Sequence, residues 1–270
     1  MCYTHLMNQP RIIVSLTSWL KRIDTVHMTI VNLKKQTVKP DKIVLYLAKS
    51  EFTKKKIPKK LVELCDDQFE IRWCENIGSY KKLIPALVDF PDDIIITVDD
   101  DIKYDERMVE LLIRGYKKYP KSVQAHRVTV VEYLSDQNIK TTVEADNIFG
   151  EESILYKFTG VGGVLYPPHC LNGNVQNRKL FMALAPTGDD IWFWVHAIMN
   201  GRKIHLVEDH LKELNYIDGT QDVGLYKKND VGGEKRPFII QLKKVINNYP
   251  RVKLKLIITT FLFKIKKRLH

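Results

Sequence analysis

The sequence predicts an α/β protein with a mixed, mostly parallel central sheet flanked by helices, and a C-terminal amphipathic helix. Short aliphatic runs alternate strictly with helical patterns through the first 120 residues. Strands and helices that alternate strictly along the chain form right-handed β-α-β units, in which consecutive strands lie parallel in one sheet. A length of 270 residues with 44% hydrophobic and 28% charged residues suits one globular body with a sizeable core.

The first half of the chain contains four predicted strands and four predicted helices. Runs of β-branched, aliphatic and aromatic residues predict the strands, at residues 12–16, 43–47, 69–73 and 94–98. Apolar residues at helical spacing, Pro58 as a first helical residue and Ser79 as a cap predict the helices, which begin near Val26, Pro58, Ser79 and Met108.

The second half of the chain is less regular. Apolar runs predict further strands at residues 123–133, 158–165 and 204–207, the second of them rich in glycine. A helix is predicted over 191–199, ended by Asn200 and Gly201. Two polar segments are expected as loops, the first as a mobile loop or an excursion near the site, at residues 135–157 and 215–233.

Three consecutive aspartates, Asp99, Asp100 and Asp101, directly follow the predicted strand at 94–98. Ligands of open α/β sheets bind beyond the carboxyl ends of the strands, so these acids are expected at the mouth of a site. If the segment stays extended, Asp99 and Asp101 point to one side and Asp100 to the other. Two carboxylates on one side suit a divalent cation that also binds substrate phosphates. The alternative is an acidic turn in solvent.

A second acidic pair, Asp189 and Asp190, begins the predicted helix that carries Trp192 and Trp194. Thr187 and Asp190 have the spacing of a capping box, and acids at a helix N-terminus interact favourably with the helix dipole. A carboxylate here can also act as a general base for an incoming hydroxyl. The tryptophans either stack on a sugar or pack in the core, with core packing expected for at least one; Trp192 is assigned to the substrate.

Other polar and glycine-containing segments complete the expected site. The segment from Asn76 to Lys82 opens a helix, so its amides and its lysines, Lys81 included, can meet phosphate oxygens; simple capping by Ser79 is the alternative. The glycines near residue 160 give no dinucleotide signature, and close approach to a ligand explains them better. The further expected substrate-binding residues are Thr17, Ser18, Asp99, Asp100, Gly162 and Gly163. His205 and His210 follow a late strand, and His210 is assigned to the metal with Asp99 and Asp101.

The formal net charge of +11 is concentrated near the C-terminus. Nine of the 43 Lys and Arg and no Asp or Glu lie from Lys243 onward, which leaves 34 basic against 32 acidic residues elsewhere. Because the body is nearly neutral, no nucleic-acid partner is expected. We therefore divide the chain into a body, residues 1–235, and a basic helical tail, residues 236–270.

The tail has an imperfect amphipathic pattern. A helical wheel places an apolar face at Leu254, Ile257, Ile258, Phe261, Leu262, Ile265 and Leu269, and leaves Val252, Leu256 and Phe263 off it. Such a helix is expected to lie on an anionic membrane surface with its lysines near the head groups. Docking onto the protein's own core or onto a partner helix is the alternative.

The cysteines and the N-terminus bear on the compartment. Four cysteines without a CxxC pair predict free thiols rather than zinc or disulfides. No secretory signal and no run of about 18 apolar residues is recognisable. We expect a cytoplasmic protein, peripheral at the inner face of the cell membrane.

Four blocks of the sequence resemble bacterial family 2 glycosyltransferases with the Rossmann-like GT-A fold, especially those of capsule and lipopolysaccharide synthesis. The blocks lie at residues 12–18, 75–78, 97–101 and 189–192. In the family a DxD motif binds a divalent metal and the nucleotide sugar, and Asp99 and Asp101 match it. The second acid of an ED-type pair is the catalytic base, and Asp190 matches it, with Asp189 in place of the usual Glu. An Asp that often contacts the base or ribose after the second strand is missing here.

The resemblance implies metal-dependent inverting transfer of a sugar, with Mn²⁺ or Mg²⁺, from a nucleotide-sugar donor to a saccharide or lipid-linked acceptor in cell-surface polysaccharide synthesis. Asp190 would deprotonate the acceptor hydroxyl. One alternative is a nucleotidyltransferase, which would normally carry a glycine-rich triphosphate loop near its first strand, whereas residues 17–22 contain no glycine. The other is a noncatalytic membrane-associated scaffold, whose aspartates would only form turns.

Overall fold

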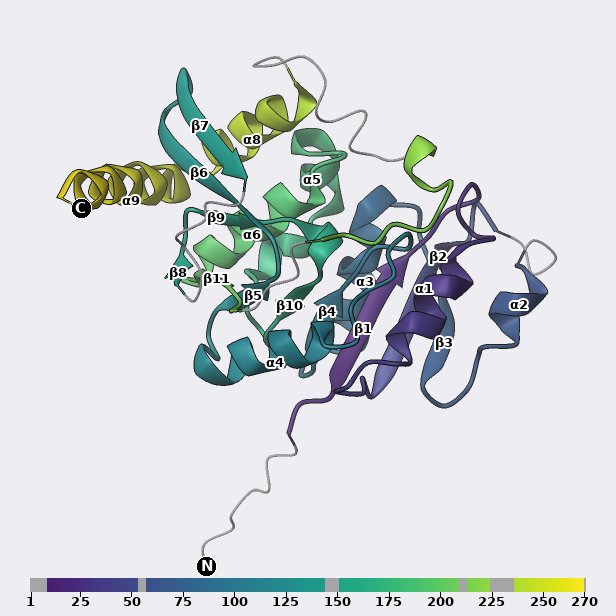
Figure 1. Ribbon diagram of the computed structural model, residues 1–270. Helices are drawn as coiled ribbons and strands as arrows, with labels where there is room; N and C mark the ends of the chain where they lie inside the picture. The colour runs from purple at the N-terminus through teal and green to yellow at the C-terminus, as the bar shows by residue number, and fades with distance from the viewer. Residues whose placement is uncertain (1–8, 53–56, 144–150, 209–212, 224–235, 270) are drawn as a thin grey trace, which may run out of the picture.

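The computed structural model describes residues 9–52, 57–143, 151–208, 213–223 and 236–269. An eight-stranded sheet has the order β3-β2-β1-β4-β10-β5-β11-β8, and a three-stranded sheet has the order β7-β6-β9. The first four strands of the large sheet are parallel to one another, whereas β10 runs antiparallel to both of its neighbours. The predicted mixed, mostly parallel sheet flanked by helices is confirmed (Figure 1).

Strands and helices alternate through the first half of the chain, as predicted. The elements are β1 (Ile12–Thr17), α1 (Val26–Leu33), β2 (Lys42–Ala48), α2 (Lys59–Val62), β3 (Phe69–Cys74), the 3₁₀ turn η2 (Gly78–Lys82), α3 (Ile84–Asp89), β4 (Ile94–Thr97) and α4 (Met108–Lys118). Ile13 and Val14 alternate between two apolar clusters, one on each face of the sheet. The two-sided burial explains why these strands are continuous apolar runs.

Strand order reverses beside β1. The chain passes from β1 outward to β2 and β3 and then returns to place β4 on the other side of β1. A crevice outside the carboxyl ends of the strands forms at such a switch point and is the usual ligand site of open α/β sheets. Thr17 ends β1 and Asp99 follows β4, so both lie at this crevice.

The second half of the chain supplies the rest of the large sheet and all of the small one. Its elements are β5 (Val123–Ala125), β6 (Val128–Ser135), β7 (Asn138–Val143), β8 (Glu152–Ser153), β9 (Tyr156–Phe158), η3 (Gly160–Gly162), β10 (Val164–Tyr166), η4 (Gly173–Gln176), α5 (Arg178–Leu184), α6 (Asp189–Met199), β11 (Ile204–Leu206), η5 (Gln221–Val223), α8 (Pro237–Asn248) and α9 (Pro250–Leu269).

Three predictions for this half are corrected. The single strand expected at 123–133 is divided, because β5 stays in the large sheet while β6 passes into the small one. The strand expected at 158–165 is likewise interrupted by η3 between β9 and β10. The segment expected as a loop at 135–157 contains β7, which pairs with β6 in a hairpin, and β8; only its residues 144–150 lie outside the described part of the chain.

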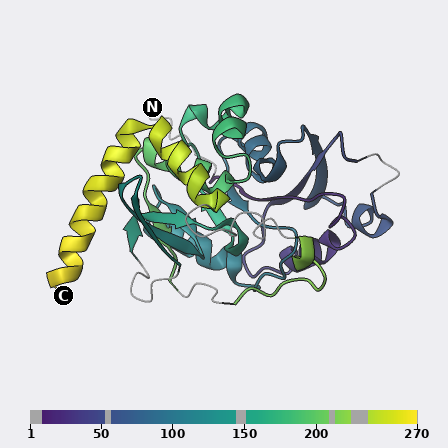
Figure 2. The ribbon, with the colours of Figure 1, turned by 90° about the horizontal axis from the view of Figure 1, so that it is seen from above.

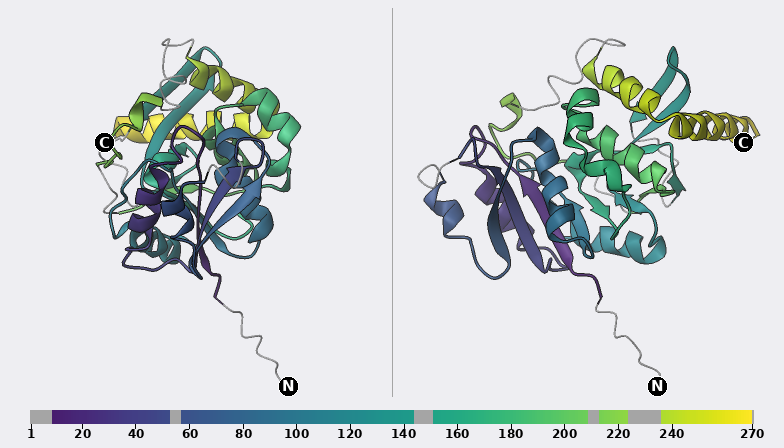
Figure 3. Two further views of the ribbon diagram at one scale, coloured as in Figure 1. Left: turned by 90° about the vertical axis from the view of Figure 1, so that its right-hand side faces the viewer. Right: turned by 180° about the vertical axis from the view of Figure 1, so that it is seen from behind.

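The helices form two layers. Helices lie on both sides of the large sheet (Figure 3). Buried residues of α1, α2 and α4 share one apolar cluster, and those of α3, α5, α6 and α8 share the other. The aromatic-rich start of α6 carries Trp192, Phe193 and Trp194, all fully buried. The cluster that includes these aromatic residues also contains residues of the large sheet and of α8 and α9, so it extends from the sheet to the C-terminal tail.

Helix α9 presents apolar residues on two opposite sides. Val252 and Leu256, which fall off the predicted apolar face, are buried against the body, and the Oγ1 of Thr260 accepts a hydrogen bond from the backbone N–H of Tyr133 on β6 at 3.0 Å. Five residues of the predicted face are instead 41–60% exposed: Leu254, Ile258, Phe261, Leu262 and Ile265. The alternative of docking onto the protein's own core is thus realised, while these five apolar residues stay in contact with solvent. The helix itself lies along the edge of the molecule (Figure 2).

Among the described residues, none of the helices combines the length and apolar character needed to cross a membrane. The cysteines within this part of the chain, Cys65, Cys74 and Cys170, are free thiols.

Candidate active site

A cavity of about 930 Å³ opens at the carboxyl edge of the large sheet. It extends from the ends of β1 and β4, past the N-terminus of α6, to the β6–β7 hairpin and the start of α8. Both acidic groups predicted from the sequence, the aspartates after β4 and the pair that begins α6, line it. Residues separated by about ninety positions along the chain therefore share one cavity.

The aspartates after β4 do not stay extended. The strand ends at Thr97 and the chain turns, so the expected alternation is wrong: Asp100 and Asp101 converge on one cation, Arg22, rather than pointing to opposite sides. The Arg22 Nη1 lies 2.8 Å from Asp100 Oδ1 and 2.9 Å from Asp101 Oδ2. Asp100 also accepts a hydrogen bond from the Ser18 hydroxyl.

Lys82 joins the two acidic groups. Its Nζ lies 3.1 Å from Asp99 Oδ1 and 3.2 Å from Asp189 Oδ2. Although burial opposes its charge, Asp189, Asp99 and Asp190 together raise the pKa of Lys82 well above its ordinary value. Lys82 is therefore held as a cation at the point where the turn after β4 meets the start of α6.

The two acids that begin α6 have different surroundings. Asp189 accepts a hydrogen bond from the Ser79 hydroxyl at 2.8 Å and pairs with Lys82. Asp190 accepts a hydrogen bond from the backbone N–H of Gly160 at 2.9 Å with Oδ2, while its buried Oδ1 has no hydrogen-bond partner. Burial raises the pKa of Asp190, and the positive charge of Lys82 acts in the opposite sense. These are the properties of a carboxylate that can accept a proton.

The predicted capping box is absent. Gly188 occupies the cap position of α6 without a side-chain hydrogen bond, and Thr187 is engaged by Gln241 of α8. Both Asp189 and Asp190 lie in the first turn of the helix, where the dipole still favours negative charge.

Negative charge predominates around Asp101. Burial and the charge of Asp99 raise the pKa of Asp101 to about 7, with Asp100 acting in the same sense and Arg22 opposing it. A divalent cation beside Asp99 and Asp101 would relieve this repulsion, so the oxygen donors and the charge fit Mg²⁺ or Mn²⁺.

The carboxylates alone do not make a complete metal shell. In the described part of the chain no three His, Cys, Asp or Glu side chains are arranged around one metal position. His210, assigned as a third ligand, lies outside the described residues. Mg²⁺ commonly uses one or two carboxylates and completes its shell with water and substrate phosphates, which is the situation that Asp99 and Asp101 offer.

Four further residues assigned to the substrate line the cavity: Thr17, Ser18, Asn76 and Lys81. The Asn76 side chain donates to Glu51 and accepts from the backbone N–H of Gly78. Lys81 is nearly buried and lies 3.7 Å from Glu51. The turn that contains Lys81 and Lys82 thus contributes positive charge to the cavity wall.

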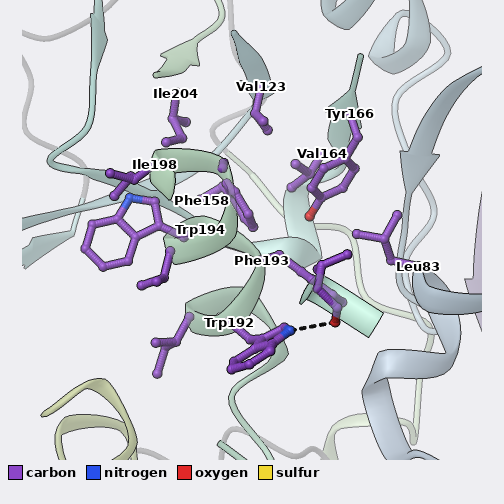
Figure 4. Close-up of a cluster of buried hydrophobic side chains, with 14 of the residues drawn as sticks. Leu83, Val123, Phe158, Val164, Tyr166, Trp192, Phe193, Trp194, Ile198 and Ile204 are labelled. Atoms are coloured by element: carbon purple, nitrogen blue, oxygen red, sulfur yellow. Dashed lines mark hydrogen bonds between the residues drawn. The ribbon is translucent and has the colours of Figure 1, made fainter. Parts of the chain in front are cut away.

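Trp192 does not line the cavity. It lies in a cluster of buried hydrophobic side chains (Figure 4) and its Nε1 donates to the backbone carbonyl of Val175 at 2.8 Å. Its ring packs against Phe181 and His196. The periodicity of a helix places Trp192 on the face of α6 away from Asp190, so the assignment to substrate contact is wrong and the core interpretation holds.

Gly162 and Gly163 also lie outside the cavity lining. A Cβ on Gly162 would meet Arg127 Cγ at 2.8 Å, and Gly163 has a φ of +93° beside Met108. Their small size is explained by neighbouring side chains rather than by a ligand. His205 is likewise buried away from the site, where its Nδ1 lies 2.6 Å from Gln124 Oε1.

Several residues at the cavity were not foreseen. Arg22 sits in the turn after β1, 78 positions from Asp100, and no local pattern identifies it. Gly160 belongs to the glycine run that the sequence indicated, but the sequence could not tell which glycine approaches the site. Lys157, Arg236 and Phe238 line the far end of the cavity and occur in segments without a motif.

Comparisons with known proteins do not name a family. No protein-family model matches the chain, and no curated protein matches it. A solved structure that it resembles is described as the crystal structure of 4-diphosphocytidyl-2C-methyl-D-erythritol synthase. The two chains are 12% identical, and the match covers 82% of this chain and 98% of that one with a TM-score of 0.46. A likeness of this degree carries no argument about activity.

Proposed function

We propose that this protein is a metal-dependent inverting glycosyltransferase of the GT-A type. It moves a sugar from a nucleotide-sugar donor to the hydroxyl of a saccharide or lipid-linked acceptor in cell-surface polysaccharide synthesis. The observation that carries the proposal is Asp190: its carboxylate lies in the same cavity as the aspartate turn, with one oxygen fixed by the Gly160 N–H and the other buried without a hydrogen-bond partner.

The donor occupies the end of the cavity at β1 and β4. Asp99 and Asp101 hold the divalent cation, which when bound neutralises charge on the leaving nucleoside diphosphate. Thr17, Ser18 and Asn76 offer polar atoms around the donor, and Lys81 and Lys82 bring positive charge to its phosphates. Arg22 holds Asp100 and Asp101 in place before the donor arrives.

The acceptor hydroxyl donates its proton to Asp190. Accepting the Gly160 N–H with one oxygen leaves the other oxygen of Asp190 to receive that proton. Asp189 is committed to Ser79 and Lys82, so its part is to hold Lys82 between the two acidic groups. The acid next to the base therefore positions a cation and does not take the proton.

The first experiment screens nucleotide sugars and, in parallel, nucleoside triphosphates mixed with sugar phosphates, each with Mg²⁺ or Mn²⁺, and measures released nucleoside diphosphate and released pyrophosphate separately. A glycosyltransferase releases the nucleoside diphosphate, whereas a nucleotidyltransferase releases pyrophosphate. A scaffold releases neither and shows no metal-dependent thermal stabilisation by a nucleoside diphosphate.

The second experiment compares Asp190→Asn with Asp189→Asn. Loss of a general base lowers kcat by about 10²- to 10⁴-fold. The amide oxygen introduced by Asp190→Asn can still accept the Gly160 N–H, so donor affinity is expected to persist. In Asp189→Asn the ion pair with Lys82 is lost and donor affinity is expected to fall as well. Near-normal transfer by Asp190→Asn with intact donor binding removes Asp190 from the role of base.

We also propose that α9 attaches the enzyme to an anionic membrane surface. The five exposed apolar residues occupy one stripe about 100° wide, with lysines on both sides, such as Lys255 and Lys264. Deleting the helix would expose the core that Leu256 covers, so a point variant is the better test. Phe261→Ser with Leu262→Ser is expected to abolish cosedimentation with phosphatidylglycerol vesicles, and unchanged cosedimentation contradicts the attachment.

A further inference from the structure

The end of the cavity farthest from the aspartate turn is cationic. We call the part of the cavity that is lined by residues 127–129, β7, β9 and the first residues of α8 the cationic end. Its charged lining residues are Arg127, Lys157 and Arg236, and among the described lining residues from these segments none is acidic. The opposite end contains the aspartates, so the cavity is strongly asymmetric in charge.

Phe238 organises the cationic end. The Lys157 Nζ lies 5.4 Å from the centroid of the Phe238 ring, and the Arg236 guanidinium carbon lies 5.3 Å from it. Arg236 also donates to the Thr141 hydroxyl of β7 at 2.9 Å. Two cations are thereby held on one ring by contacts that fix their positions before a ligand binds.

The cationic end adjoins the base. Lys157 lies in β9, three residues before Gly160, whose N–H fixes Asp190. Lys157 is 4% exposed, and its Nζ donates to the backbone carbonyl of Phe158 at 2.9 Å. A molecule whose hydroxyl reaches Asp190 would therefore extend toward Lys157 and Arg236.

We infer that the cationic end binds an anionic group, a carboxylate or a phosphate, carried by the acceptor. That this site binds an anionic group rests on the cavity alone. That the anionic group belongs to the acceptor rests on the proposed function. A planar guanidinium group and an ammonium group that are both held on an aromatic ring can form charge-assisted hydrogen bonds to the oxygens of a carboxylate or a phosphate. The acceptor class is then a saccharide with an acidic sugar or a phosphate ester next to the hydroxyl that reacts.

The test is calorimetric titration of the full-length protein. Inorganic phosphate is titrated into protein saturated with Mg²⁺ and the nucleoside diphosphate found in the donor screen, and the titration is repeated with protein alone. Phosphate is expected to bind saturably in both, and about tenfold more weakly to Arg236→Met and to Lys157→Met. Lys59→Met, which removes one charge from a side chain that is 89% exposed, is the matched control and is expected to bind as the native protein does.

Two outcomes overturn the inference. Phosphate binding that is absent, or equal in native protein and Arg236→Met, removes the anion site. Binding of the nucleoside diphosphate that weakens about tenfold in the same variants, with no phosphate binding to the saturated protein, assigns these cations to the donor instead. Because Arg236 is half-buried at the cavity edge, its variant keeps the test open if Lys157→Met does not fold.

A second arm identifies the anion. Methyl glucuronide and glucose 6-phosphate are each titrated against methyl glucoside as the neutral control. Tighter binding of the first indicates a carboxylate, and tighter binding of the second indicates a phosphate ester. Phosphate binding that depends on Arg236 without any metal-dependent binding of a nucleoside diphosphate retains the anion site and refutes the proposed function, so the two failures are distinguishable.

Discussion

Replacing Gly160 with alanine perturbs the centre of the site by one methyl group. An added Cβ would lie 2.7 Å from Lys82 Nζ and 2.9 Å from Asp190 Oδ1. Lys82 is held by ion pairs with Asp99 and Asp189, and Asp190 is held by the Gly160 N–H itself. Neither group can therefore move away from the added methyl group without weakening one of these contacts.

The size of the effect follows from these distances. Ordinary van der Waals contact begins at about 3.4 Å, so each group must retreat by about half an ångström or more. Misplacement of a catalytic group by about 1 Å can cost about 100-fold in rate, and we expect Gly160→Ala to lower kcat by between about ten and a hundredfold. Gly160 does not have a positive φ, so alanine adds no backbone strain there.

The assay measures kcat for transfer and, separately, the unfolding midpoint in urea. Gly173→Ala is the control, because a Cβ at Gly173 meets nothing within 4 Å. We expect the control to keep native kcat and both variants to unfold within about 2 kcal/mol of the native protein, since the smaller unfolded-state entropy of alanine offsets part of the crowding. Native kcat in Gly160→Ala would refute the placement of Lys82 and Asp190 at the reacting atoms.

Three further predictions concern stability. His196 and His205 are buried, and burial lowers the pKa of each to about 4. Because the unfolded chain binds more protons than the folded protein below about pH 6.5, the free energy of unfolding should fall by about 2 kcal/mol per histidine between pH 7 and pH 5. Urea unfolding of His196→Gln should show a smaller fall over the same pH range. Leu256→Ala on the docked side of α9 should cost about 2–5 kcal/mol, whereas Leu262→Ala on the exposed stripe should cost less than about 0.5 kcal/mol; equal costs would contradict the docking. Trp192→Phe should lower the free energy of unfolding by about 1–3 kcal/mol, because the Val175 carbonyl loses its hydrogen-bond donor. The KM values for the sugar donor and the acceptor should stay unchanged, and a raised KM would indicate that Trp192 contacts a substrate.

Much of the architecture could be predicted because it depends on local patterns. Strands buried on both faces must be continuous apolar runs, and the acids that follow such a run must lie at the sheet edge. The apolar runs located β1 to β4 and placed Asp99 at the edge of the sheet, whereas Asp190, which begins a helix, was assigned to the same site from the family resemblance. The division of residues 123–133 between two sheets could not be predicted, because each part is itself a valid strand and only pairing partners separate them.

The details of the site depend on contacts between distant segments. Alternation of side chains holds only while a strand lasts, and β4 ends at Thr97, so Asp100 and Asp101 turn toward the same arginine. The tail illustrates the same limit. A helical wheel detects one apolar face, but Val252 and Leu256 on the opposite side make the contact with the body, and the wheel cannot say which face the body covers.

The two ends of the cavity differ in charge. The aspartate turn is so negative that burial and neighbouring carboxylates raise the pKa of Asp101 to about 7, despite the ion pair with Arg22. In the proposed function a nucleoside diphosphate adds further negative charge at that end, and a divalent cation beside Asp99 and Asp101 would offset it. At the cationic end the protein itself supplies the positive charge, because Lys157 and Arg236 both lie over the ring of Phe238. An anionic donor and an anionic acceptor can thus approach Asp190 from opposite sides, the first through a metal and the second through the protein's own cations.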